Sequence, residues 1–214
     1  MQGHKPHRFG RAHGDFTGRR SHFYDVLARL VLRPVYRRIA ADLAGTVPDD
    51  ADVLDIGTGP GVLVLELARR RPDVKVTATD LSADMVERAE RNLREVGERA
   101  TARVADATDL PFEDGSFDLV VTSFSMHHWA EPEAAVPELA RVLRPGGRLA
   151  VYDFRDAPFD RLTGAAGERG LFGGGTGERT LFDTGLFFKR RCERLVLSAQ
   201  PSPSPSGEWR SRNA

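Results

Sequence analysis

Cysteine is almost absent from this sequence, and its scarcity excludes two common ways of stabilising a chain. Cys192 is the only cysteine among 214 residues, so an internal disulfide and a cysteine-based zinc cluster are both excluded. Long apolar runs are missing as well. The most apolar early stretch, residues 26–32, is interrupted by Arg29 and is far too short to cross a bilayer. Without a secretory signal or a transmembrane segment, the sequence predicts a cytoplasmic protein.

A net charge of one sign is also lacking, although the charges are unevenly distributed. Lysines and arginines equal the acidic residues, with 31 of each. Residues 1–45 carry six excess positive charges and residues 186–214 carry four, whereas residues 46–185 carry ten excess negative charges. Basic flanks can attract an anionic substrate, a phospholipid surface or RNA. They equally suit packing against the acidic middle or keeping the chain ends soluble, and we favour these simpler roles.

The length fits one domain with flanking tails. Residues 1–20 are rich in glycine, histidine and arginine and predict a flexible basic tail, with a metal site at their three histidines as the alternative. Alternating prolines and serines favour a disordered tail over residues 201–214. The domain is expected over residues 21–200. Its first part, residues 21–45, reads as an amphipathic helix that Pro34 kinks or divides.

The most informative stretch reads VLDIGTGPG, from Val53 to Gly61. Its apolar start suits a buried strand, its glycines suit a turn, and the apolar spacing that resumes at Val62 suits a helix. In a strand, turn and helix of this kind, backbone N–H groups at the helix start face a ligand. Glycine is needed where a Cβ would block the approach of that ligand. A turn that binds nothing is the alternative.

The spacing of the glycines separates two kinds of ligand. Gly57, Gly59 and Gly61 alternate, whereas a dinucleotide fingerprint requires G-x-G-x-x-G or G-x-G-x-x-A beneath a pyrophosphate. Asp55 stands just before the loop, where its carboxylate would repel a pyrophosphate but suit an ammonium and a sulfonium. Asp80 ends the next predicted strand, 19 residues after the last of these glycines. An acidic residue near this offset accepts hydrogen bonds from a ribose diol, although Asp80 could simply end the strand.

Five blocks in order resemble the class I S-adenosylmethionine (SAM) dependent methyltransferases, most closely the small-molecule (type 11) group that includes the ubiquinone/menaquinone-biosynthesis type. The blocks are VLDIGTGPG, ATDLS at 78–82, VADA at 104–107, LPFEDGSFDLVVTSFSMHHW at 110–129 and LARVLRPGGRLAVYDF at 139–154. The resemblance runs from about Phe23 to Tyr152. It implies an α/β fold: a Rossmann-like doubly wound, mostly parallel sheet with helices on both faces, whose cofactor-binding core spans residues 51–154.

The resemblance also implies which residues contact SAM. Those at its methionine end are Asp55 and the backbone of Gly57, Thr58, Gly59 and Gly61. Those at its ribose and adenine are Asp80, Leu81, Asp106 and Ala107. Those near its methyl-bearing sulfur are Ser123 and Phe124. Leading helices of this family cover the cleft, which makes Phe23, Tyr24 and Tyr36 candidate lid residues, with a plain core role as the alternative.

The residues themselves support a site independently of the family. Open α/β sheets bind ligands outside the carboxyl ends of their strands. Asp55, Asp80, Asp106 and Ser123 all fall at such ends, so we expect them to converge on one crevice. Asp106 would also suit a structural role at the start of a turn over residues 106–109.

Methyl transfer needs an oriented acceptor, and a base where the acceptor is weakly acidic. His127 and His128 follow the fourth predicted strand and are candidate general bases, because imidazole titrates near neutral pH; capping a turn is their alternative role. No metal-ligating set is evident. SFSMHH stands where enzymes that methylate amino groups in nucleic acid carry asparagine-proline-proline-tyrosine. The predicted partner is therefore a small-molecule acceptor and not nucleic acid, and the oligomeric state is left open.

The last third of the chain departs from the family pattern. Seven glycines within residues 164–177 indicate a loop, residues 180–185 read as the end of a helix, and only residues 193–197 read as a strand. The antiparallel pair that usually closes the sheet therefore lacks a second member, which makes this end atypical. Pro137 also leads us to expect that the helix around it begins near Val136.

Three functions are compatible with these features. The leading hypothesis is a SAM-dependent methyltransferase that transfers a methyl group to an oxygen, carbon or nitrogen of a small molecule. The second is a degenerate SAM-binding or scaffold protein without turnover, motivated by the irregular C-terminal third. The third is an NAD(P)-dependent oxidoreductase, which the alternating glycines and the preceding acidic residue disfavour.

Overall fold

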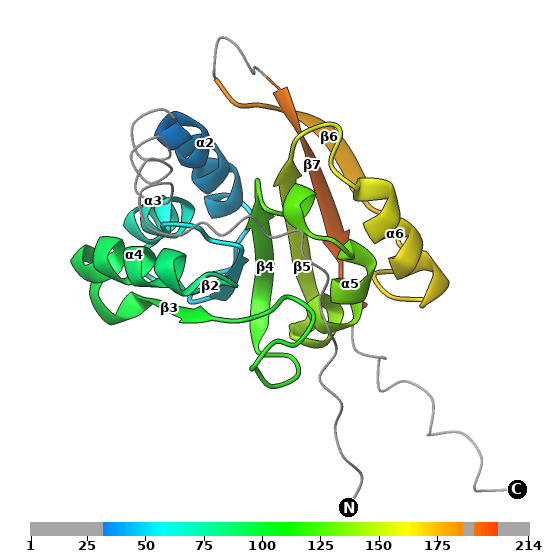
Figure 1. Ribbon diagram of the computed structural model, residues 1–214, viewed down its shortest axis with the longest axis horizontal. Coiled ribbons are helices and arrows are strands. Elements are labelled where there is room, and N and C mark those ends of the chain that lie inside the picture. The colour runs from blue at the N-terminus through cyan, green and yellow to red at the C-terminus, as the bar shows by residue number, and fades with distance from the viewer. Residues whose placement is uncertain (1–31, 186–190, 201–214) are drawn as a thin grey trace, which may run out of the picture.

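The computed structural model describes residues 32–185 and 191–200 of the chain. In this part, seven strands form one sheet in the order β3-β2-β1-β4-β5-β7-β6 (Figure 1). The strands are β1 Asp52–Ile56, β2 Lys75–Asp80, β3 Ala100–Val104, β4 Phe117–Ser123, β5 Leu143–Asp153, β6 Glu178–Asp183 and β7 Arg191–Ser198. The first five run parallel, and β7 runs antiparallel to both β5 and β6. The predicted α/β, doubly wound fold is confirmed.

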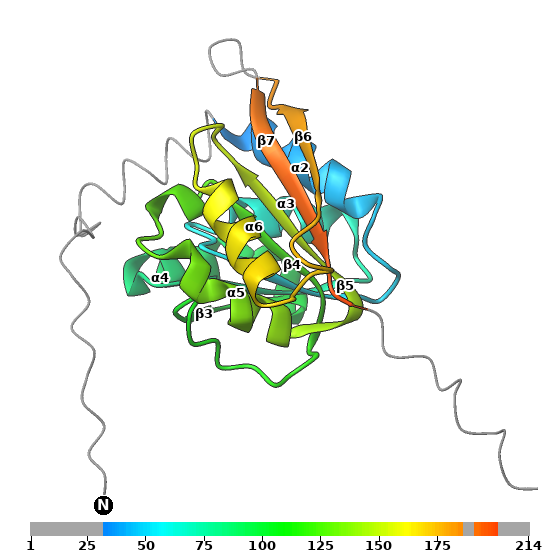
Figure 2. The ribbon, with the colours of Figure 1, turned by 90° about the vertical axis from the view of Figure 1, so that its right-hand side faces the viewer.

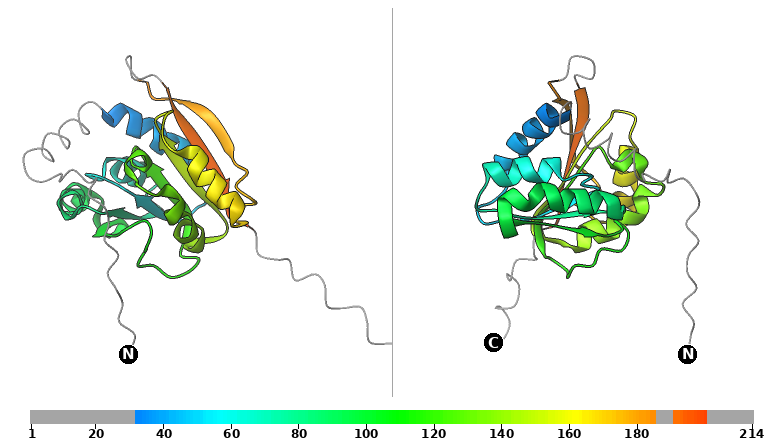
Figure 3. Two further views of the ribbon diagram at one scale, coloured as in Figure 1. Left: turned by 45° about the vertical axis from the view of Figure 1, so that its right-hand side comes forward. Right: turned by 60° about the vertical axis from the view of Figure 1, so that its left-hand side comes forward.

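Helices cover both faces of the sheet. They are α2 Arg33–Ala44, α3 Val62–Arg70, α4 Ala83–Leu93, α5 Pro132–Arg141 and α6 Phe159–Glu168, with short 3₁₀ turns η2 Arg94–Arg99 and η3 Met126–His128. Figures 2 and 3 show α2, α3 and α4 on one face and α5 and α6 on the other. Each face has its own apolar core, and alternate residues of the central strands belong to different cores: Val53 faces the first and Leu54 the second. This alternation explains why the central strands read as continuous apolar runs.

The parallel arrangement brings four strand ends to one edge of the sheet. In the register of the pairs, Asp55 of β1 lies beside Ala78 of β2 and Val121 of β4. On the far side of β4, Ser123 pairs with Tyr152 of β5. The carboxyl ends of β2, β1, β4 and β5 therefore adjoin one another. As the sequence predicted, Asp55, Asp80 and Ser123 lie at the carboxyl ends of β1, β2 and β4.

Helix α5 begins earlier than expected. It spans Pro132–Arg141 with Pro137 inside it, so the predicted start near Val136 is wrong. Pro137 is exposed, and water can therefore hydrate the Glu133 carbonyl oxygen that loses its helical donor. The buried residues Ala135 and Leu139 hold the helix against the sheet, and this packing outweighs the missing hydrogen bond.

The C-terminal third is more regular than the sequence indicated. Residues 178–183 form strand β6, which pairs with β7 from end to end, so the predicted helix end at 180–185 is wrong and the antiparallel pair is complete. Helix α6 includes Gly164 and Gly167 of the glycine-rich segment that we expected to be a loop. Its stripe of Phe159, Leu162, Ala165 and Ala166 is buried, which offsets the low helix propensity of the two glycines.

The leading helix is only partly within the described residues. Helix α2 begins at Arg33 with Pro34 in its first turn, a position where proline costs no hydrogen bond. The predictions for residues 1–20, for residues 201–214 and for Phe23 and Tyr24 lie outside the described residues. The domain boundaries stay predictions.

Candidate functional site

Asp55 lies buried under the glycine loop. Its side chain is 1% exposed, and within the described residues neither carboxylate oxygen has a hydrogen-bond partner. Burial raises the pKa of Asp55 to about 7; the Thr58 side chain partly opposes this rise, and the negative charge of Asp80 adds to it. A buried carboxylate of this kind is costly unless a cation or donor pairs with it. The site therefore suits a positively charged group.

Most backbone N–H groups of the glycine loop already donate hydrogen bonds within the chain. Those of Thr58, Gly59 and Gly61 donate to acceptors within the chain at 2.9, 2.8 and 3.1 Å, and Pro60 has none. This differs from the sequence-based expectation that N–H groups of the loop face a ligand. A pyrophosphate needs such donors, so the closed loop and the carboxylate beneath it disfavour a dinucleotide.

Asp80 is held in a fixed orientation at the end of β2. One carboxylate oxygen accepts from the Gly59 N–H at 2.8 Å, and the other accepts from the Ser82 N–H at 2.9 Å. Each carboxylate oxygen has further lone-pair directions, so hydroxyl donors can bind in addition. Leu81 follows directly and is 52% exposed, which leaves a large apolar side chain beside the carboxylate. These positions suit the predicted ribose and adenine contacts.

Asp106 follows β3 and has a structural role of its own. Its Oδ1 accepts from the N–H and the hydroxyl of Thr108 at 2.9 and 2.8 Å. Its backbone forms a bridge with Asp109, which is the turn named as the alternative. Ala107 is half-buried and packs against the core under α5 and α6. The adenine contact of both residues stays a prediction.

The loops after β1 and β4 touch each other. Gly57 has a φ of +69°, and a Cβ on it would lie 1.8 Å from the hydroxyl oxygen of Ser125. Glycine is therefore required here by the chain's own packing, in addition to any ligand. Ser123 is buried, and Phe124 has a φ of +51°. This contact places Ser123 and Phe124 close to the loop above Asp55.

His127 contacts a carboxylate that the sequence analysis missed. Nδ1 of His127 lies 2.7 Å from Oδ1 of Asp153, and its backbone N–H donates to Oδ2 at 3.0 Å. Asp153 is fully buried at the end of β5. An acidic residue that ends an apolar strand was the signal used for Asp55, and AVYDF offers the same signal. His128 is exposed, with its ring centroid 3.9 Å from that of His127.

Aromatic rings extend this edge of the site. Phe154 lies 4.9 Å from the His127 ring and 5.2 Å from Phe124. Tyr36 of α2 meets Phe124 edge to face at 6.1 Å and is itself buried. Tyr36 thus has the core role named as the alternative, while still touching a predicted site residue.

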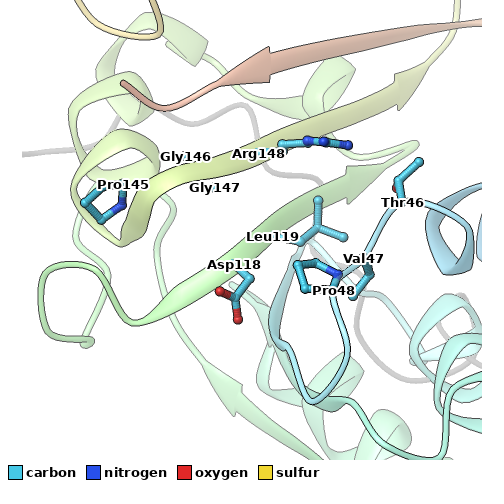
Figure 4. A pocket seen from close by; sticks show the side chains of 9 residues that line it. All are labelled: Thr46, Val47, Pro48, Asp118, Leu119, Pro145, Gly146, Gly147 and Arg148. Atoms are coloured by element: carbon cyan, nitrogen blue, oxygen red, sulfur yellow. The ribbon is translucent and has the colours of Figure 1, made fainter. Parts of the chain in front are cut away.

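A separate hollow of about 210 Å³ lies at the opposite edge of the sheet. Figure 4 shows its lining side chains, which come from the loop after α2, the start of β4 and residues 145–148. Asp118 in this lining accepts from the backbone N–H of Asp52 at 2.9 Å and pairs with Arg144. Its charge is thus already satisfied, and the hollow adjoins none of the predicted site residues.

The described residues contain neither a metal-binding cluster nor a membrane-spanning helix. In residues 32–185 and 191–200, no group of three or more His, Cys, Asp or Glu side chains could hold a metal ion. Over the same ranges, no helix combines the length and apolarity needed to cross a bilayer.

Comparison with known proteins agrees with this geometry. Residues 53–147 match a family described as a methyltransferase domain. A demethylmenaquinone methyltransferase from Thermus thermophilus is 41% identical over 140 residues, which cover 63% of this chain and 62% of the relative. A 27-O-demethylrifamycin SV methyltransferase from Amycolatopsis mediterranei is 41% identical over 125 residues, covering 56% of this chain and 46% of the relative.

A solved structure supports the fold. A protein from Methanococcus maripaludis, whose assignment as a SAM-dependent methyltransferase is itself provisional, superposes with a TM-score of 0.76 at 21% identity. The match covers 92% of this chain and all of that one. At this identity the likeness shows the fold alone.

These matches support the resemblance that the sequence motifs indicated. Residues 53–147 match a methyltransferase domain, and the curated relatives are named as methyltransferases. The chain spans less than two thirds of the length of these curated relatives.

Proposed function

We propose that this protein is an enzyme that transfers the methyl group of SAM to a small-molecule acceptor. The observation that carries the proposal is the buried carboxylate of Asp55 beneath the glycine loop, which has no hydrogen-bond partner among residues 32–185 and 191–200. The ammonium of the methionine end supplies the positive partner that this carboxylate lacks. Pairing in a site shielded from water is worth far more than on the surface, because the effective dielectric is lower.

The remaining contacts with SAM are assigned to residues at the carboxyl edge of the sheet. Asp80 binds the ribose hydroxyls, and Leu81 packs on the adenine. Asp106 accepts from the adenine amino group, with Ala107 beside it. The loop formed by Gly57, Thr58, Gly59 and Gly61 positions the methionine end mainly by its shape, because three of its N–H groups are already used. Ser123 and Phe124 lie next to the sulfur.

SAM supplies an activated methyl group on a sulfonium, so the protein needs no nucleophile of its own. The chain orients the acceptor in line with the methyl carbon and excludes water. Orientation of this kind contributes on the order of 7–11 kcal/mol in favourable intramolecular reactions. The aromatic side chains of Phe124 and Phe154, with the buried Tyr36 behind Phe124, offer an apolar wall against which an acceptor can lie.

The class of acceptor is proposed from the relatives and from this wall. The two relatives are named for demethylmenaquinone and for 27-O-demethylrifamycin SV. An apolar acceptor with a hydroxyl or an activated carbon is consistent with both names and with the aromatic lining. We propose no nucleic-acid partner, and a cytoplasmic location stays part of the proposal.

Calorimetric titration of SAM into the purified chain tests the proposal. We expect one site in the micromolar range, about −8 kcal/mol. Asp80→Ala removes charge-assisted hydrogen bonds to the ribose and should weaken binding by roughly 100-fold or more. Asp84→Ala, four residues further on in α4, removes the same charge and should leave the affinity within a few fold. Absence of SAM binding by the unaltered chain would overturn the proposal.

Two further measurements separate the rival functions. Quenching or enhancement of NADH fluorescence on titration would favour an oxidoreductase, and we expect none. Transfer of label from methyl-labelled SAM to any compound of a metabolite extract would exclude a degenerate SAM-binding protein, and we expect such transfer.

A further inference from the structure

His127 and Asp153 form a pair at the carboxyl edge of the sheet that the proposed SAM contacts do not use. The carboxylate of Asp153 accepts three donors: Nδ1 of His127 at 2.7 Å, the backbone N–H of His127 at 3.0 Å and that of Phe154 at 2.7 Å. The carboxylate is fully buried and belongs to the last residue of β5. The sheet therefore fixes the carboxylate, and the carboxylate fixes the imidazole ring.

This arrangement selects one tautomer of the ring. A carboxylate that already receives two backbone N–H groups acts as an acceptor, so Nδ1 of His127 carries the proton. In the neutral ring Nε2 is then the unprotonated nitrogen. Nε2 lies on the far side of the ring from Nδ1, away from the buried carboxylate. With 25% of the His127 side chain exposed, the ring is not sealed within the core.

The surroundings of the ring link it to the proposed methyl-transfer site. The His127 ring contacts Phe154, which in turn contacts Phe124 at the end of β4. Ser125, two residues before His127, touches Gly57 of the loop above Asp55. The pair thus borders the same edge as the proposed cofactor contacts, on the side of β5.

We propose that His127 is the general base for the methyl acceptor and that Asp153 is the positioning residue that keeps Nε2 unprotonated. This inference rests on the proposed function and narrows the acceptor to one whose attacking oxygen or carbon carries a proton that must be lost. Nε2 takes that proton while the acceptor's electron pair forms the bond to the methyl carbon. The electron pair of the broken carbon–sulfur bond leaves with the neutral thioether product. The imidazolium then returns its proton to water.

The same geometry distinguishes the two candidate histidines. A buried carboxylate orients Nδ1 of His127, whereas His128 is exposed and directly follows it in η3. A base oriented through its second nitrogen is held in the correct tautomer and stabilised when protonated. We therefore assign the base to His127.

Nitrogen-detected NMR of the full chain with ¹⁵N-labelled histidine tests the tautomer. His127→Gln identifies the signals of His127 by their loss. In the unaltered protein above neutral pH, we expect a protonated Nδ1 and an unprotonated Nε2. Asp153→Asn should shift the ring toward the other tautomer, and Asp156→Asn, an exposed acid on the same segment, should leave the spectrum of His127 unchanged. A protonated Nε2 in the unaltered protein would overturn the assignment without reference to any variant.

Initial rates of label transfer from methyl-labelled SAM to extract compounds test the role in catalysis. Asp153→Asn and His127→Gln should each lower the rate by about 10²–10⁴-fold, with SAM affinity within twofold of the unaltered chain, and Asp156→Asn should keep the full rate. Unchanged rates in the first two variants would overturn the base assignment alone. Failure of the unaltered chain to bind SAM would instead overturn the proposed function, and the base role with it.

Discussion

Replacing Asp55 by asparagine should stabilise the free protein at high pH while abolishing its use of SAM. The carboxylate of Asp55 is buried without a hydrogen-bond partner in the described chain, and burial raises its pKa to about 7 from the ordinary 3.8. The folded state therefore holds a proton on Asp55 more tightly than the unfolded state does. The stability that this tighter proton binding contributes is fully present below pH 3.8 and is lost as the pH rises through about 7.

The magnitude follows from the size of the shift. A difference of about 3 pH units corresponds to about 4 kcal/mol at pH 8, at 1.36 kcal/mol per unit. Asparagine has no charge to bury, but its buried amide N–H donors cost roughly 1–3 kcal/mol at every pH. The unaltered protein should therefore be more stable than Asp55→Asn near pH 4 and less stable near pH 8. Across this range the difference between their unfolding free energies should change by about 4 kcal/mol.

Urea denaturation of both proteins at several pH values between 4 and 8 measures this change. Asp156→Asn serves as the control, since Asp156 is exposed. The unfolding free energy of this variant should equal that of the unaltered protein at every pH. Saturating SAM should remove the high-pH penalty of the unaltered protein, because the ammonium pairs with the carboxylate. If the unfolding free energies of the unaltered protein and Asp55→Asn differ by the same amount from pH 4 to pH 8, the reasoning is refuted.

Three further outcomes follow from particular contacts. Asp106→Ala should weaken SAM binding by about tenfold, as expected for one lost hydrogen bond; calorimetry measures it, and an unchanged affinity contradicts the adenine contact. Gly57→Ala should cost more than about 2 kcal/mol in urea denaturation, since its Cβ would lie 1.8 Å from the Ser125 hydroxyl oxygen. Gly170→Ala, at a similar φ with open space, should cost only about 1 kcal/mol, and equal losses would speak against a packing role. Cys192 is buried and its pKa is raised to about 12, so a thiol reagent at pH 8 should label it only in urea; rapid labelling of the folded chain is the opposite result.

The centre of the fold was predictable because local pattern and tertiary packing agree there. Strands β1 and β4 are buried on both faces, so their apolar residues are visible in the sequence as runs, whereas β2 shows alternation through Val76 and Ala78. Glycines and acidic residues at their carboxyl ends mark where the chain leaves the sheet. The same signals place Asp55, Asp80 and Ser123 at one edge of the sheet.

The C-terminal third was not predictable for the opposite reason. Strand β6 is an edge strand whose side chains are mostly exposed, with only Phe182 half-buried, so it shows no apolar alternation. Its existence depends on the hydrogen bonds of β7. In α6 and α5, glycine and proline oppose a helix locally, and burial against the sheet overrides them.

Within the predicted site, the sequence indicated candidate residues but not the interactions among them. It could not show that the N–H groups of Thr58, Gly59 and Gly61 are satisfied by the chain itself. It also did not connect His127 with Asp153, which are 26 residues apart and meet only because β4 and β5 are neighbours. Such pairings depend on strand order, which no local pattern contains.

Proton release on SAM binding at pH 6 tests the central claim most directly. At this pH Asp55 of the free protein is mostly protonated, because its pKa is raised to about 7, and pairing with the ligand's ammonium requires it to ionise. Calorimetric titrations in buffers of different ionisation enthalpy should therefore show close to one proton released per SAM bound, and none for any residual binding by Asp55→Asn. Binding of SAM by the unaltered chain without proton release would contradict the account.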